Sequence, residues 1–243
     1  LINRPEFISD DPVQFPRRFE SLADIEIVAL LSSAIAWGNR KMICRDADRM
    51  LALMEHQPYR YMMERGYEEL DPDMNIHRTF FARNLSNFLS GIRGIYVRHG
   101  SLADFARANG VGEDEAPAWR LVELVNAELD KATDGIHDSR CLPGNLAVTA
   151  LKRVNMALRW LVRDDGIVDM GVWKGVIDKS RLYIPLDVHV GNTARSLGLL
   201  ERRGNDRRAV EQLTGVLRTM RPADPVYYDY ALFGIGVTGK QLD

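Results

Sequence analysis

The sequence has few cysteines and no long apolar run. Its 243 residues include only two cysteines, Cys44 and Cys141, which stand far apart and form no CxxC motif. Two isolated thiols cannot supply a disulfide framework, a four-cysteine iron–sulfur cluster or a zinc ribbon. No stretch of about 18 uncharged apolar residues is present, so no membrane span is predicted. No secretory signal is visible either, and a cytoplasmic protein is the expectation.

Metal-ligand spacing is also lacking. The five histidines are scattered, without an HxxxH or HD pair. Asp187 and His189 stand two residues apart and leave a metal hydrolase as a weak alternative. We therefore expect no metal and no cofactor.

Strand-like alternation of apolar and polar residues does not extend beyond a few positions, and there is no internal repeat or low-complexity tract. Apolar residues instead recur at helical spacing almost throughout. Helices are predicted over residues 21–38, 41–56, 79–100, 101–110, 118–133, 148–163, 187–200, 206–220 and 225–236. The sequence thus predicts an all-α protein, with a hydrophobic content of 46% that suffices for one large domain or two lobes.

The net charge of −2 conceals an uneven distribution. Residues 151–221 carry 14 Lys/Arg against 8 Asp/Glu, whereas the remainder carries 18 against 26. A basic third on an acidic body is compatible with one side that faces phosphates. Solvated charged helix faces produce the same pattern, so both interpretations stay open.

The stretch IPLDVHV places one carboxylate, Asp187, at the start of a predicted helix. Asp is a preferred N-cap residue, which is a purely structural explanation. A carboxylate at that point also stays ionised, because the backbone N–H groups and the helix dipole favour the anion. It could therefore stabilise positive charge that develops on a sugar. The two roles are compatible in one residue.

The helix predicted over residues 148–163 carries Lys152 among the apolar residues Leu151, Val154 and Met156. A lysine amine is a nucleophile only when neutral, and desolvation by apolar neighbours favours the neutral form. Lys152 is thus a candidate nucleophile. A solvated or phosphate-binding lysine is the alternative.

The Leu-Pro-Gly sequence that ends at Gly144 lies ahead of this helix. Backbone N–H groups in a tight glycine-containing turn can hold a phosphate oxygen without a side chain. Gly144 and Asn145 are the candidate positions. An ordinary helix–helix turn has the same sequence features.

Four stretches in order, ALLSSAIAWGNRKM, LPG, IPLDVHV and YALFGIG, resemble the helix-hairpin-helix (HhH-GPD) DNA glycosylase superfamily. More narrowly, DPVQFPRRF, LKRVNMALRWLVRDDG and DPVYYDYALFGIGVTG resemble a bacterial branch of that superfamily. The resemblance implies a two-lobed helical fold with a helix-hairpin-helix and a catalytic cleft between the lobes. It implies that residues 1–21 pack with the C-terminal lobe, that residues 22–163 form a helical barrel lobe with the hairpin, and that residues 164–243 form a loop and the C-terminal lobe.

The resemblance also implies an activity, that of a DNA glycosylase with associated AP-lyase activity. Lys152 would be the nucleophile and Asp187 its electrostatic and acid–base partner. An oxidised purine such as 8-oxoguanine is the first candidate substrate, because a lysine–aspartate pair separated by a long loop looks most like the branches that act on oxidised guanine. The implied partner is double-stranded DNA with a damaged base, bound by a monomer in the bacterial cytoplasm and associated with the nucleoid. The segment LPGNLAVTALK is longer than the family hairpin by about a helical turn, so a non-catalytic DNA- or RNA-binding protein is the alternative.

Other site residues follow from the same resemblance. Contacts with DNA are expected from Gly144, Asn145, Arg153, His189, Arg195, Asn39 and Arg40, the last two as residues that fill the gap left by a flipped base. The wall of the base pocket is expected from Met156, Trp37 and Phe233. Core packing or surface charge explains each of these residues when it is considered singly.

Overall fold

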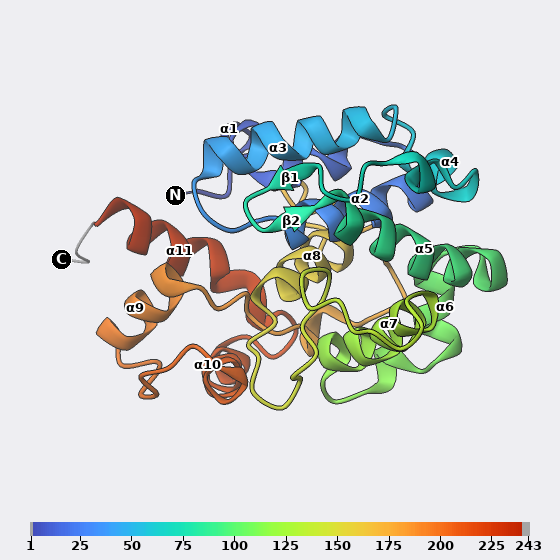
Figure 1. Cartoon of the computed structure of the whole chain (residues 1–243). Coiled ribbons are helices and arrows are strands. Elements are labelled where there is room, and N and C mark those ends of the chain that lie inside the picture. The colour runs from blue at the N-terminus through green and yellow to red at the C-terminus, as the bar shows by residue number, and fades with distance from the viewer. Residues whose placement is uncertain (1, 240–243) are drawn as a thin grey trace. The chain divides into compact units, whose positions relative to one another are not determined.

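The computed structural model describes residues 2–239, and the chain is mostly helical over this range (Figure 1). It divides into two compact units. The N-terminal unit comprises residues 8–111 and 120–144, and the described C-terminal unit comprises residues 2–7, 112–119 and 145–239. The helical class expected from apolar spacing is confirmed at this level.

The N-terminal unit consists of helices and one short strand pair. Its elements are η1 (Pro12–Gln14), η2 (Pro16–Arg18), α2 (Leu22–Ala34), α3 (Arg40–Leu53), α4 (Pro58–Met63), η3 (Gly66–Glu69), β1 (Asn75–His77), β2 (Phe80–Phe81), α5 (Ala82–His99) and α6 (Leu102–Ala108). Three elements cross from one unit to the other along the chain, namely α1 (Pro5–Ser9), η4 (Val111–Glu113) and α7 (Pro117–Ala132).

Helix α2 lies in the core because its sequence is apolar on every face, and every residue from Ile25 to Ala34 is buried. Its buried carboxylate, Glu26, accepts hydrogen bonds from the backbone N–H groups of Leu102 and Ala103, each at 2.9 Å. The first amides of a helix have no partner within the helix, so Glu26 supplies acceptors for the start of α6. A charge that would be costly in the core thereby joins α2 to α6.

Strands β1 and β2 pair antiparallel, a feature that the helical spacing did not predict. His77 of β1 is buried, and its ring nitrogens contact Asp46 Oδ2 at 2.7 Å and the carbonyl oxygen of Trp37 at 3.0 Å. The Trp37 ring packs edge-on against His77, with 4.9 Å between the centroids. The chain just after α2 is therefore fixed by a side chain from the strand pair.

The C-terminal unit is helical. Its elements are α8 (Lys152–Val162), η5 (Lys179–Arg181), α9 (Val188–Ser196), α10 (Arg207–Met220), η6 (Pro225–Tyr228) and α11 (Asp229–Thr238). Every residue of α8 from Val154 to Val162 is buried, which makes α8 the central helix of this unit. Trp160 and Trp173 are among its most deeply buried side chains.

The start of α8 differs from the sequence-based expectation. The helix begins at Lys152 and not at Val148, because Leu151 takes up a left-handed conformation (φ 47°, ψ 36°) that a helix cannot continue through. Ahead of it, the N–H of Thr149 donates to the carbonyl of Asn145 at 3.3 Å in a separate turn. Residues 133–151 connect α7 to α8 without a helix or strand. The helix-hairpin-helix that the resemblance implies stays a prediction.

The two compact units divide the chain at other positions than the predicted domain ranges, and those ranges stay predictions. Residues 8–21 belong to the N-terminal unit, whereas residues 1–21 were expected to pack with the C-terminal lobe. Helix α8 belongs to the C-terminal unit, whereas the predicted barrel lobe extended to residue 163. None of the helices within residues 2–239 has both the length and the apolar character needed to cross a membrane.

Candidate active site

Lys152 is the first residue of α8 and its side chain is half-buried. The left-handed turn at Leu151 sets this starting point, and Asn155 reinforces it by donating from Nδ2 to the carbonyl of Ala150 at 3.1 Å. The partial positive charge at a helix N-terminus disfavours a second positive charge.

Asp187 is the N-cap of α9, as its sequence predicted. Its Oδ1 accepts a hydrogen bond from the N–H of Val190 at 2.8 Å, and its own carbonyl accepts one from Asn205 Nδ2 at 3.1 Å. The residues just before it, Ile184 to Leu186, are buried and hold the cap in place. The side chain of Asp187 is itself half-buried, so the carboxylate faces partly outward.

Helices α9 and α11 pack closely against each other (Figure 1). A Cβ atom added at Gly236 would lie 2.8 Å from the carbonyl oxygen of His189 and 2.9 Å from Thr193 Oγ1. Only glycine fits at this approach. The His189 ring also meets Phe233 of α11 edge-on, with 5.9 Å between the centroids.

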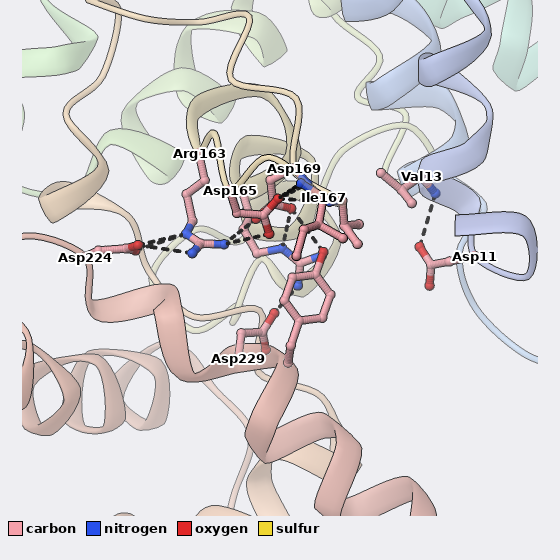
Figure 2. Close-up of polar contacts among 11 residues, drawn as sticks. Asp11, Val13, Arg163, Asp165, Ile167, Asp169, Asp224 and Asp229 are labelled. Atoms are coloured by element: carbon pink, nitrogen blue, oxygen red, sulfur yellow. Dashed lines mark hydrogen bonds and ion pairs between the residues drawn. The ribbon is translucent and has the colours of Figure 1, made fainter. Parts of the chain in front are cut away.

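Buried charged side chains connect α8 with α11 (Figure 2). They also connect α8 with Asp169, which follows it, and with Asp224, which precedes η6. Arg159 of α8 donates to Asp169 Oδ1 at 3.2 Å and to the hydroxyl of Tyr230 at 2.6 Å, and it forms an ion pair with Asp229, the first residue of α11. The Tyr230 hydroxyl in turn donates to Asp169 at 3.1 Å.

Arg163 extends this cluster by one helical turn. Its Nε contacts both carboxylate oxygens of Asp224, at 3.0 and 3.2 Å, and its Nη1 pairs with Asp169. Asp165 follows α8 and accepts three backbone hydrogen bonds, from the N–H groups of residues 167, 168 and 169. We refer to Arg159, Arg163, Asp169, Asp224, Asp229 and Tyr230 together as the charged cluster.

Burial shifts the pKa values of both carboxylates that contact Arg159. Burial raises the pKa of Asp229 to about 6 despite the neighbouring Arg159 cation, and the negative charge of Asp187 adds to the rise. Burial likewise raises the pKa of Asp169. Burial also opposes the Arg163 cation, but its hydrogen bond to Asp224 and the charge of Asp169 outweigh that effect and raise its pKa. Asp187 and Asp229 thus interact electrostatically.

Lys152 shares one face of α8 with the charged cluster. It precedes Arg159 by seven residues, which is close to two turns and about 10 Å along the helix axis. The charge of Asp187 reaches Asp229, and Asp229 pairs with Arg159. Lys152 and Asp187 thus belong to the same unit, Lys152 on the helix that carries Arg159 and Asp187 at the cap of the helix that packs against α11.

The remaining predicted residues of the C-terminal unit have varied surroundings. Arg195 donates to the carbonyls of Arg202 and Gly204, at 2.8 and 3.2 Å, and so closes the loop after α9. His189 is exposed, with Nδ1 3.3 Å from the carbonyl oxygen of Gly236. Met156 is buried one turn after Lys152, and Arg153 is half-buried. Their proposed contacts with DNA or a base stay predictions.

Three predicted residues belong to the N-terminal unit. Trp37 is half-buried against His77. Asn39 caps α3 by accepting from the N–H of Met42 at 3.3 Å, and Arg40 is the first residue of that helix. Asn39 therefore has a structural role, and its role at a DNA gap stays a prediction, as do those of Arg40 and Trp37.

Gly144 and Asn145 are exposed in the long connection before α8. A Cβ added at Gly144 would lie 2.8 Å from Nε2 of His137, and that nitrogen also lies 3.1 Å from the carbonyl oxygen of Leu142. Asn126 Nδ2 donates to the carbonyl of Pro143 at 3.0 Å. Side chains, and not a short turn between helices, hold this stretch of backbone.

The charged cluster was not predicted from sequence. Its signal lies at the end of α8, where Arg159 and the following C-cap residue Arg163 are four residues apart among Leu158, Trp160 and Leu161. Arginines on the apolar face of a helix require buried acidic partners. Asp169 follows soon after α8, but Asp224 and Asp229 come from a return of the chain 61 and 70 residues after their arginines.

The structure thus defines a mostly helical protein. A buried ion pair joins α8, which begins with Lys152, to α11, and α11 packs against α9, which Asp187 caps. Residues 11–238 match the family described as Protein of unknown function (DUF2400). The match covers nearly the whole chain, and the protein belongs to this family. No curated protein and no solved structure matches the chain.

Proposed function

We propose that this protein is a DNA glycosylase with AP-lyase activity, in which Lys152 is the nucleophile and Asp187 its electrostatic and acid–base partner. The observation that supports it is the pair of helix starts in one unit: Lys152 begins α8, whose Arg159 forms an ion pair with Asp229 of α11, and Asp187 caps α9, which packs against α11. The resemblance of IPLDVHV and LKRVNMALRWLVRDDG to the HhH-GPD superfamily supplies the role of each residue. The proposed substrate is an oxidised purine such as 8-oxoguanine in double-stranded DNA, with association of the protein with the bacterial nucleoid.

The proposed chemistry begins when the neutral Lys152 amine attacks C1′ of the damaged nucleotide. The bond between C1′ and the base breaks, and the base leaves with the bonding electron pair and takes up a proton. Asp187 stabilises the positive charge on the sugar and accepts the proton that the amine loses. The sugar ring then opens, its ring oxygen takes up a proton, and an imine joins Lys152 to C1′. Loss of a C2′ proton expels the 3′ phosphate, and water hydrolyses the imine to release the lysine.

The damaged base has to leave the duplex before this attack, at a cost of a few kcal/mol. Met156, Trp37 and Phe233 are proposed to contact the flipped base, and Asn39 and Arg40 to occupy the gap. Gly144, Asn145, Arg153, His189 and Arg195 are proposed to contact the DNA backbone. Such contacts would make binding weaken steeply as salt rises.

Borohydride trapping tests the proposal directly. The full-length protein is incubated with duplex oligonucleotides that each carry one lesion, 8-oxoguanine among them, and borohydride is then added to reduce the imine to a stable amine. We expect a covalent protein–DNA adduct with the wild type and none with Lys152→Ala. Lys179→Ala is the matched control, because Lys179 is an exposed lysine on η5 of the same unit. Base release without an adduct would refute the lyase assignment and retain a monofunctional glycosylase.

A non-catalytic nucleic-acid-binding protein is the second candidate. It is favoured by the long connection over residues 133–151, which replaces a short hairpin before Lys152. Tight, salt-sensitive binding of duplex DNA or RNA with neither base release nor adduct would support this candidate and refute the enzyme.

A further inference from the structure

We propose that Arg159 is a positioning residue: its buried contacts to Asp229 and Asp169 hold the helix that carries Lys152 against α11, and through α11 against the cap residue Asp187. The inference rests on the proposed function, since it assigns a role within that site. None of the three residues of this pairing touches substrate in the proposal. Instead, they set the positions of Lys152 and Asp187.

The first argument is the number of directional contacts that meet at one guanidinium. Arg159 contacts Asp169, Asp229 and Tyr230, and all four side chains are buried. A planar guanidinium fixes the direction of each of these contacts, whereas a lysine ammonium is a point charge on a flexible stem. The contacts therefore fix the rotation of α8 as well as its distance from α11.

The second argument is that buried ion pairs contribute little to stability. Taking charges out of water costs as much as their attraction returns, and apolar residues of similar volume often stabilise a core equally well. The charged cluster buries two arginines with three aspartates, so it carries one uncompensated carboxylate. Its retention in the core is better explained by the geometry that it imposes on α8 and α11.

The third argument is the tight contact between α11 and α9. Gly236 leaves no room for a side chain against His189 and Thr193, so α9 packs directly on α11. Asp187 caps α9 and Asp229 is the first residue of α11, and the charge of Asp187 raises the pKa of Asp229. A displacement of Asp229 relative to Arg159 would therefore shift Asp187 relative to Lys152.

The test compares Arg159→Lys and Asp229→Asn with the control Asp224→Asn. The control removes an equally buried carboxylate from the other arginine of the charged cluster, Arg163, and leaves the Arg159 contacts in place. Rates of borohydride-trapped adduct formation are measured at saturating DNA, together with Tm. We expect a loss of about tenfold to a hundredfold for the first two variants and less than about twofold for the control, at similar Tm shifts. Equal losses in all three variants would overturn the proposal.

Tyr230→Phe is the milder variant if the charge variants do not fold, because it removes only the hydroxyl between Arg159 and Asp169. We expect the same selective loss of rate, smaller in size. Unchanged rates with Tyr230→Phe, at a lowered Tm, would reduce the charged cluster to a structural element and overturn the inference.

A readout without DNA separates this inference from the proposed function. The chain contains six lysines, which can be ¹³C-methylated and resolved by NMR, with Lys152 assigned through Lys152→Arg. We expect the Lys152 methyl resonance to move in Asp229→Asn and Arg159→Lys and to stay in place in Asp224→Asn. If the wild type forms no adduct with any lesion, the proposed function alone fails. If the Lys152 resonance moves in neither Asp229→Asn nor Arg159→Lys, the positioning role is overturned.

Discussion

Asp187 caps α9 through the N–H of Val190, which donates to its Oδ1 at 2.8 Å. Within residues 2–239, no donor is seen for its second oxygen, Oδ2. One oxygen of the carboxylate thus stabilises the helix, and the other is available for a partner outside the described chain. The cap and the proposed catalytic role are separable by mutation.

Asp187→Asn and Asp187→Ala should separate the two roles. Asparagine caps a helix about as well as aspartate, so we expect Asp187→Asn to change the free energy of unfolding by less than about 0.5 kcal/mol. Alanine removes the cap, and we expect a loss of about 1 kcal/mol. Both variants should lose adduct formation, because each lacks the negative charge. Urea unfolding and borohydride trapping measure the two effects, and activity in Asp187→Asn would refute the catalytic role.

Asp206 provides the matched control for that comparison. It caps α10 by accepting from the N–H of Ala209 at 3.0 Å, in the same unit. Asp206→Ala should cost about 1 kcal/mol of stability, as Asp187→Ala does, and leave adduct formation intact. Loss of activity in Asp206→Ala would indicate that Asp187 variants act through stability.

Gly236→Ala should separate α9 from α11. The added Cβ would lie 2.8 Å from the backbone oxygen of His189, which cannot move without moving α9. We expect a loss of about 1–3 kcal/mol in the free energy of unfolding, measured by urea titration. Gly215→Ala is the control, because Gly215 lies within α10 and a Cβ there meets nothing within 4 Å. That variant should gain about 0.5–1 kcal/mol from helix propensity, and an equal loss at both positions would contradict the close packing of α9 on α11.

The raised pKa of Asp229 predicts a stability that falls as pH rises. Burial brings this pKa to about 6 in the folded protein, against about 3.9 in an unfolded chain. The folded state therefore holds the proton more tightly, and its advantage is complete below about pH 4 and lost as pH rises through 6. We expect the free-energy difference between wild type and Asp229→Asn to decrease by about 1–3 kcal/mol over this range in urea unfolding. A difference that is constant from pH 4 to 7 would show that Asp229 is ionised throughout.

Asp206 should give the opposite pH dependence. Its hydrogen bond with Arg202 lowers its pKa to about 2. The stabilisation is therefore present above about pH 4 and is lost as pH falls through 2. Because a third of the side chain is exposed, solvent screening limits the effect to less than about 1 kcal/mol. Comparing wild type with Asp206→Asn at pH 5 and pH 2 by chemical unfolding checks the direction, and a larger difference at pH 2 would contradict it.

The helices and their caps could largely be predicted from the sequence. The apolar residues of α2 and the amphipathic pattern of α10 are local signals, and Ser21, Asp187 and Asp206 mark three helix starts. The start of α8 was missed, because the left-handed conformation of Leu151 is rare outside glycine and leaves no mark in the residue type. The strand pair at β1 and β2 was missed because five residues are too few to show alternation.

The sequence by itself determined that the chain is helical, where Asp187 caps a helix, and that Lys152 lies among apolar neighbours in one helix. These properties depend on spacings within a single helix. The tertiary structure decided that Arg159 and Arg163 pair with Asp169, Asp224 and Asp229, and that Asp187 acts on Asp229. Asp169 lies 10 and 6 residues after the two arginines, whereas Asp224 and Asp229 lie 61 and 70 residues after their partners. Because any acidic residue could neutralise a buried arginine, only packing selects which one does.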